Sequence, residues 1–196
     1  MKSKKKNSLI NYVFLTLLMA FSIVSCSKQE AEPNVFKLTS PAVSNGLLLN
    51  DFKCETKVNG IENSIPLSWS NVPLGTNAFA ITMIHYPNPN DVVNYNSYLE
   101  LWGIDKSVIS IDYGKADDGP WFMGPNKDLN AISYTSPCSQ GSGTQRYTIT
   151  IYALSSTPAS LPTQSSMLVT NQVLINSLSS VNILGKATLV FDSVTP

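Results

Sequence analysis

The sequence predicts a mostly β protein: a two-sheet antiparallel β-sandwich with one C-terminal helix. Three observations lead to this fold class. Several short runs alternate apolar and polar residues, as strands with one buried face do. Pro, Gly, Asn and Ser, which favour turns, fill the segments between these runs. Only one segment of any length, late in the chain, has apolar residues at helical spacing. Short strands, long loops and a single late helix are typical of a sandwich or an open barrel.

Three runs carry the strand prediction. In FAITMIH, residues 79–85, and in YTITIYAL, residues 147–154, the odd-numbered positions share one face, because strand side chains alternate. KATLVFDSV, residues 186–194, repeats this pattern near the end of the sequence. No internal repeat or linker divides this part of the sequence, so we expect one domain over residues 36–196.

The helix is predicted within TQSSMLVTNQVLINSL, residues 163–178. Thr163 or Ser165 is available there as the N-cap, because a hydroxyl can accept a hydrogen bond from a free backbone N–H of the first turn. Many residues of this segment are poor helix formers, so packing against the sheet has to hold the helix. Four residues fall on one stripe of it: Met167, Thr170, Leu174 and Leu178.

The first 26 residues have the features of an export signal. Four lysines precede an apolar stretch over residues 12–24, which is shorter than the ~20 residues that span a bilayer. The stretch ends in Ile-Val-Ser-Cys, which resembles a bacterial lipobox with Cys26 as the lipidated residue. We therefore expect a lipoprotein signal peptide over residues 1–26, a flexible tether over residues 27–35, and a protein of the bacterial cell envelope, lipid-anchored to a membrane.

Charge excludes one class of partner. Cleavage before Cys26 would remove four of the thirteen basic residues and none of the thirteen acidic ones, which leaves a mildly acidic chain. No basic run follows Lys28, so the sequence offers nucleic acid no electrostatic footprint. We expect no cofactor and no metal, and the sequence does not specify a protein partner.

Two cysteines remain in the predicted domain, Cys54 and Cys138. In an oxidising compartment such a pair forms a disulfide more often than a metal site or a nucleophile. No histidine or further cysteine lies at ligand spacing from either one. We therefore predict a disulfide between Cys54 and Cys138.

Three segments carry motifs beyond their periodicity. They are residues 52–83, LWGI over residues 101–104, and YTSPCSQGSGTQRYTITIYAL over residues 134–154. In the first segment the motif residues are Phe52, Cys54, Asn63, Pro66, Leu67, Trp69, Val72, Pro73, Gly75, Thr76 and Phe79. Together these motifs resemble the phosphatidylethanolamine-binding protein family, and among its members the bacterial Raf-kinase-inhibitor-like branch. LWGI is similar to a family strand that ends in Val-Trp-Asn-Ile, and residues 134–154 are similar to a family loop and strand with Gly-Pro-Cys-Pro-Pro and His-Arg-Tyr. The resemblance implies two face-to-face antiparallel sheets with a C-terminal helix.

The resemblance also implies a small pocket, which family members use to hold an oxyanion. The first family aspartate falls on His85, and neither possible register of HYPNP restores a carboxylate. Tyr98 and Gln145 stand at the positions of the family's two pocket histidines, and Ser136 stands at the position of the family's loop glycine. Tyr134 matches the family's loop tyrosine. Tyrosine and glutamine can donate hydrogen bonds but carry no positive charge. The altered pocket implies a small neutral or weakly charged ligand.

His85, the chain's only histidine, has two interpretations: a pocket donor in place of the family aspartate, or the polar end of a core strand. It has no nucleophile near it in sequence, so we expect no enzymatic activity. The favoured function is a non-enzymatic, membrane-tethered domain that binds a small ligand. The alternative is a cell-envelope protein-interaction module with a vestigial pocket, which would use the loops over residues 87–96 and 112–130.

Overall fold

A computed structural model describes residues 34–91, 93–139 and 141–195, and the fold below is that of this part of the chain. The predicted signal peptide, Cys26 and most of the predicted tether lie outside the described residues. None of the helices described is long and apolar enough to cross a membrane.

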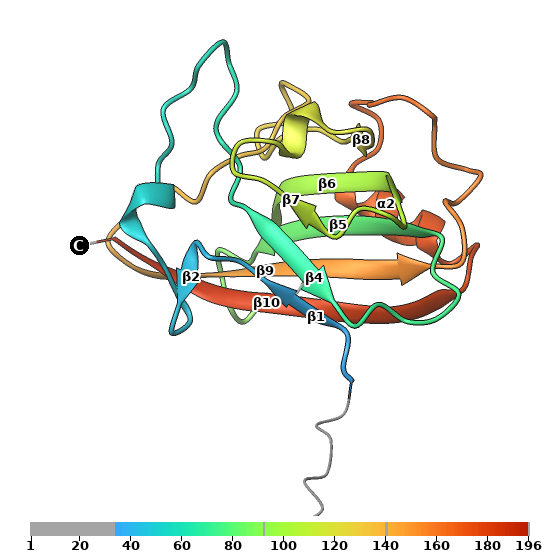
Figure 1. Ribbon diagram of the computed structural model, residues 1–196. Helices are drawn as coiled ribbons and strands as arrows, with labels where there is room; N and C mark the ends of the chain where they lie inside the picture. Colours follow the sequence, from blue (N-terminus) through green and yellow to red (C-terminus); the bar gives the residue numbers. More distant parts are fainter. Residues whose placement is uncertain (1–33, 92, 140, 196) are drawn as a thin grey trace, which may run out of the picture. The chain divides into compact units, whose positions relative to one another are not determined.

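Two β-sheets face each other across the main core (Figure 1). A three-stranded sheet has the order β1-β4-β7, and a seven-stranded sheet has the order β2-β3-β10-β9-β5-β6-β8. Neighbouring strands are antiparallel, except that β3 and β10 pair in parallel. The two-sheet sandwich predicted from the sequence is confirmed. The elements are β1 (Lys37–Thr39), β2 (Val43–Ser44), β3 (Leu47–Leu48), η1 (Asn50–Phe52), β4 (Leu67–Ser70), β5 (Ala78–His85), β6 (Asn96–Asp105), β7 (Ser110–Ile111), η2 (Ala116–Asp118), β8 (Phe122–Met123), β9 (Gly143–Leu154), α2 (Asn171–Leu178) and β10 (Ile183–Thr195).

Alternation along β9 builds the main core. Tyr147, Ile149, Ile151 and Ala153 are buried, and the residues between them are less so until the strand's end. From the opposite sheet Leu67 and Trp69 of β4 pack against this face. The predicted inward face of residues 147–154 is therefore confirmed.

Strand β5 differs from β9 because both of its faces are covered. Its odd-numbered residues belong to the main core, while Ala78 and Ala80 belong to a second apolar cluster together with Leu174 and Leu178 of α2. The helix therefore packs on the outer face of the seven-stranded sheet. Small alanine side chains in β5 leave room for this close packing.

The helix exists where the sequence predicts it, but it begins later than expected. Thr170 is the N-cap, and its hydroxyl accepts from Val173 N at 3.4 Å, so the predicted caps Thr163 and Ser165 are wrong. The Ser165 hydroxyl instead accepts from Met123 N of β8 at 3.0 Å. Ser166 N also donates to the Met123 carbonyl at 3.0 Å, and a turn with a hydrogen bond from Val169 N to the Ser166 carbonyl follows, so the helix starts only beyond this turn.

Strand β6 has a register irregularity that decides which way its side chains face. The pairing with β5 shifts between Met83 and Ile84, opposite residues 97–99. As a result Tyr98 and Leu99, although consecutive, both join the main core. Glu100, the next residue, is buried on the other side.

Candidate functional site

The predicted pocket residues begin with three rings that meet where β5, β6 and β9 lie side by side. His85 pairs with Tyr147 in the β5–β9 register, and their rings stack with centroids 4.9 Å apart. Tyr98 meets Tyr147 edge to face at 5.1 Å and lies 6.4 Å from His85. The structure thus brings together the residues that take the places of the family's first aspartate and first histidine.

The protonation of the His85 ring follows from its one hydrogen bond among the described residues. Its Nδ1 lies 2.8 Å from the carbonyl oxygen of Arg146. Because a carbonyl oxygen can only accept, Nδ1 carries the proton and donates. The other ring nitrogen, Nε2, therefore accepts a hydrogen bond when the ring is neutral. With an exposed fraction of only 7%, His85 is both a core residue and a potential pocket acceptor.

The two tyrosines remain neutral hydroxyls over the physiological pH range. Burial raises the pKa of Tyr98, and burial together with the neighbouring Tyr98 hydroxyl raises the pKa of Tyr147. Neither side chain can supply positive charge to an anion. The cluster offers hydrogen bonds only.

The loop before β9 borders this cluster. Thr135 N donates to the carbonyl of Tyr98 at 3.0 Å, which places the loop against β6. Tyr134 is 1% exposed, and its hydroxyl has no hydrogen-bond partner among the described residues. Burial, and secondarily the charge of Glu62, raises the pKa of Tyr134 well above its ordinary value.

Ser136 and Gln145 are placed less favourably. The Ser136 hydroxyl accepts from Glu55 N at 3.0 Å, and its N–H donates to the Glu62 carboxylate, so both polar groups are engaged with the segment after Cys54. Gln145 lies half-buried on β9, opposite Ser193 of β10 and on the same face as Tyr147. Their role as ligand contacts stays a prediction.

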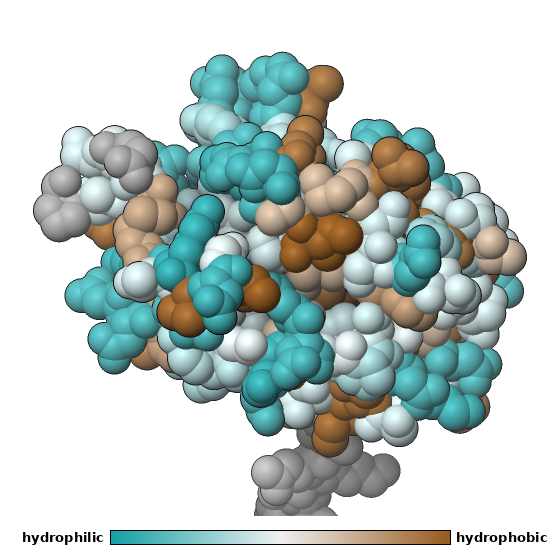
Figure 2. Space-filling model, turned by 90° about the horizontal axis from the view of Figure 1, so that it is seen from above, coloured by the Kyte–Doolittle hydropathy of each residue, from teal (hydrophilic) through white to brown (hydrophobic). Residues whose placement is uncertain are grey.

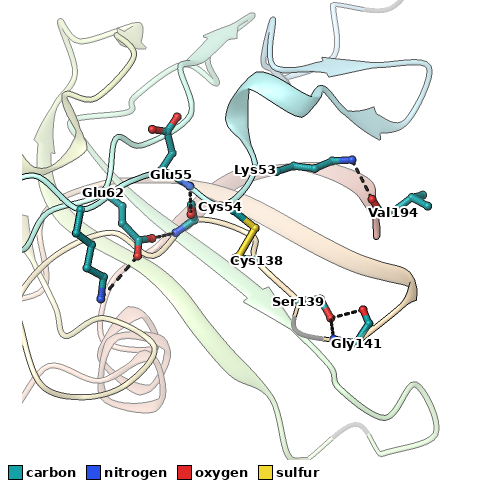
Figure 3. The surroundings of a disulfide bond; sticks show 10 residues. Lys53, Cys54, Glu55, Glu62, Cys138, Ser139, Gly141 and Val194 are labelled. Atoms are coloured by element: carbon teal, nitrogen blue, oxygen red, sulfur yellow. Dashed lines mark hydrogen bonds and ion pairs between the residues drawn. A yellow bond between two sulfur atoms is a disulfide. The ribbon is translucent and has the colours of Figure 1, made fainter. Parts of the chain in front are cut away.

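A disulfide fixes the position of this loop. Cys54 and Cys138 are bonded, as predicted, and Cys54 N also donates to the Pro137 carbonyl at 3.1 Å. Figure 3 shows the bond between the segment after η1 and the loop before β9, with Glu62 on the same side. The loop wall of the candidate pocket is therefore covalently held.

Two carboxylates near this loop were not expected from the sequence. Asp117 Oδ1 accepts from Tyr134 N at 3.1 Å, and burial raises the pKa of Asp117 to about 6. Glu62 accepts from Ser136 N of the same loop and pairs with Lys57 at 3.7 Å. Asp117 is half-buried, whereas the neighbouring Asp118 is exposed. No local signal in the sequence separates the two, because the hydrogen bond to Asp117 comes from a residue 17 positions away.

Arg146 lies outside the site. Its guanidinium donates to both oxygens of Asp192 on β10, at 2.9 and 3.1 Å. Alternation along β9 puts it on the face opposite Tyr147. Among the described residues, no group of three or more His, Cys, Asp or Glu side chains is arranged to hold a metal ion. The site is therefore a set of neutral hydrogen-bonding groups with acidic neighbours.

Comparisons with known proteins agree with this fold. The model of the phosphatidylethanolamine-binding protein family matches residues 39–191, so the chain belongs to that family. Among solved structures it is similar to the homologue CT736 of Chlamydia trachomatis, with 22% identity, a TM-score of 0.66, and coverage of 83% of this chain and 99% of that one. It is also similar to YbcL of Escherichia coli, with 19% identity, a TM-score of 0.65, and coverage of 82% and 99%. No curated protein sequence matches the chain.

Proposed function

We propose that the protein is a non-enzymatic, membrane-tethered domain that binds a small neutral or weakly charged ligand. The observation that carries this proposal is the contact among His85, Tyr98 and Tyr147 at the predicted pocket. The ligand contacts would be His85, Tyr98, Tyr134, Ser136 and Gln145. Membership of a family named for binding phosphatidylethanolamine supports a ligand-binding role.

Charge supports a change of ligand relative to the family. A phosphoryl group needs cationic or multiple N–H donors to offset its desolvation. Here Arg146 is bound to Asp192, and the charged side chains that accept hydrogen bonds from the Tyr134 loop are those of Asp117 and Glu62. A doubly charged anion would be repelled by these carboxylates, whereas a neutral group with hydroxyls or amides would not.

The absence of catalysis is part of the same proposal. A nucleophile or a general acid needs an activating neighbour at hydrogen-bond distance. The Nδ1 atom of His85 is used by a backbone carbonyl, and its ring neighbours are two tyrosines whose hydroxyls stay protonated. This arrangement supports binding and offers no activated nucleophile among the described residues.

The alternative proposal is a protein-interaction module of the cell envelope. On the face that Figure 2 shows, hydrophobic side chains form small separate patches between polar ones. Broad apolar patches mark interaction sites, whereas isolated apolar residues are ordinary on protein surfaces. This face therefore gives the alternative no specific support.

Calorimetry tests the proposal directly. The purified chain would be titrated with phosphoethanolamine, inorganic phosphate, and the neutral molecules glycerol and acetamide. We expect heat from at least one neutral compound and little from either phosphate at pH 7. A matched variant, Tyr98→Phe, removes one hydroxyl from the proposed site and should weaken the binding of the neutral compound. Tight phosphate binding by the unmodified chain would contradict the proposal.

A further inference from the structure

A cavity lies on the outer face of the seven-stranded sheet, opposite the face that carries Tyr98 and Tyr147. It is a groove with a volume of about 540 Å³, between the start of α2, strand β6 and the segment after β8. None of the five predicted ligand residues lines it. Its polar lining includes Tyr95, Ser97, Glu100, Asn126, Asn171 and Gln172.

Unsatisfied polar atoms gather in this groove. Among the described residues, seven buried side-chain nitrogen and oxygen atoms lack a hydrogen-bond partner, and four of them belong to groove residues. These four atoms are Ser97 Oγ, both carboxyl oxygens of Glu100, and Asn171 Nδ2. A buried polar atom without a partner destabilises a protein by about 1–3 kcal/mol, so such atoms are rare unless something binds them. Their concentration in one groove points to a ligand.

Glu100 is the centre of the groove. It is 1% exposed, and backbone passes close beside it, because Gly124 N donates to the Glu100 carbonyl at 3.0 Å. A Cβ atom at position 124 would lie 3.0 Å from the Glu100 Cβ and 2.4 Å from the Val169 carbonyl oxygen. The chain therefore needs glycine there in order to enclose the carboxyl group from one side.

The lining of the groove carries little charge. Burial raises the pKa of Glu100 to about 8, so the carboxyl group is mostly protonated at neutral pH. The Asn171 amide lies near enough to oppose this rise, although Asn171 Nδ2 does not reach hydrogen-bond geometry with either Glu100 oxygen. Lys127, the other charged residue of the lining, pairs with Asp128. Neither a strong cation nor a strong anion is favoured by such a lining.

The unsatisfied atoms have complementary needs. The protonated Glu100 carboxyl group and the Ser97 hydroxyl can each donate and accept hydrogen bonds, whereas Asn171 Nδ2 can only donate. The first-turn N–H groups of α2 are further donors without partners inside the helix. An ammonium group would donate to Glu100 but would leave the Asn171 amide without an acceptor. An anion would accept from Asn171 and from the protonated Glu100 carboxyl group. However, Lys127, the one cation among the described residues of the lining, is paired with Asp128, so nothing there would offset the negative charge.

Hydroxyl groups meet both needs because each one donates and accepts. Adjacent hydroxyls on a ring can contact the two Glu100 oxygens and the Asn171 amide at once, and Tyr95 adds an aromatic surface at the groove. We propose that the groove between α2 and β6 binds a neutral polyhydroxylated ligand of the size of a mono- or disaccharide. This site is separate from the pocket at His85 and does not depend on it.

Titration of the purified full chain with glucose, galactose, N-acetylglucosamine and cellobiose tests this proposal. Ethanolamine and inorganic phosphate serve as the cationic and anionic probes. At least one sugar should bind measurably, and Glu100→Gln and Asn171→Ser should each weaken it about tenfold, the loss expected for one buried hydrogen bond. Gln172→Ala changes an exposed residue at the start of the helix and leaves the buried side chains intact, so its effect on sugar affinity should be smaller.

Asp105→Asn is the matched control. It makes the same carboxylate-to-amide change in the same strand, at its exposed end, and should leave sugar affinity unchanged. Thermal unfolding of each variant would show that the fold persists. The proposal is overturned if no sugar binds, if Asp105→Asn and Glu100→Gln have equal effects, or if ethanolamine or phosphate binds in a Glu100-dependent way and the sugars do not.

Discussion

The imidazole of His85 stacks on the ring of Tyr147, with centroids 4.9 Å apart, and its Nδ1 atom is bound to a backbone carbonyl. The ring is therefore fixed in orientation and in tautomer, with only Nε2 left for a ligand. One fixed acceptor beside two neutral tyrosines suits a hydrogen-bonded ligand better than a phosphate group.

Restoring the two family histidines should restore anion binding. In the double variant Tyr98→His, Gln145→His, two imidazoles can take up protons near the pocket, so phosphoethanolamine should bind more tightly below the ordinary histidine pKa of about 6.5. Calorimetry at pH 6.0 and 8.5 measures this effect. We expect an affinity gain of about tenfold at the lower pH and none at the higher. An equal gain at both values would show that protonation is not the cause.

Removal of the disulfide should destabilise the domain. The bond closes a loop between cysteines 84 residues apart, and loop-closure entropy predicts a stabilisation of about 4 kcal/mol. The double variant Cys54→Ser, Cys138→Ser should therefore unfold at a clearly lower denaturant concentration. Oxidised and reduced samples of the unmodified chain are the control pair. Identical unfolding midpoints in all samples would contradict the expected stabilisation.

Glu100 should make stability depend on pH. Its pKa is about 8 in the folded chain, against an ordinary value of 4.5, so between these values the folded state keeps a proton that the unfolded state has lost. The free energy of unfolding should fall as pH rises through this range, by at most about 1.4 kcal/mol per pH unit. Asp117 acts in the same direction but only up to about pH 6.

Denaturant unfolding at pH 6.5 and 8.5 isolates the effect of Glu100 from that of Asp117. Glu100→Gln cannot titrate and should lose most of the difference between the two pH values. Asp105→Asn, on the exposed end of the same strand, should keep it. A Glu100→Gln variant with an unchanged pH dependence would assign the effect to another group.

The start of α2 can be tested with two threonines. Thr170→Ala removes the observed N-cap and should lower the free energy of unfolding by about 1 kcal/mol. Thr163→Ala changes a candidate cap that the structure leaves exposed, so it should have little effect. Equal losses in the two variants would contradict the helix start at Asn171.

The proposed lipid anchor depends on Cys26, which lies outside the described residues. Cys26→Ser should abolish incorporation of radiolabelled fatty acid and leave the precursor uncleaved at that position. Cys54→Ser should keep its label. Labelling that persists in Cys26→Ser would refute lipidation at this cysteine.

The features predicted correctly from the sequence are those that depend on local periodicity. Alternation identified the inward face of residues 147–154, and a pair of cysteines identified the disulfide. The helix start was missed because Thr163, Ser165 and Thr170 are equally good caps in sequence. Only the contact between Ser165 and Met123 N decides among them.

Glu100 and Asp117 could not be recognised from the sequence for a related reason. Each contacts residues distant in the chain: Glu100 is buried beside Gly124 and the start of α2, and the half-buried Asp117 accepts from Tyr134 N. A single acidic residue in a strand or loop has no periodic signal that separates a buried carboxyl from a solvated one. Tertiary packing alone makes the difference.

The register irregularity in β6 places two candidate sites on one short piece of chain. Tyr98 faces the main core between the sheets, and Glu100, two residues later, faces the groove under α2. An inserted or deleted residue just before Tyr98 would rotate both side chains away from their positions together. The length of this strand is therefore constrained by two candidate sites at once.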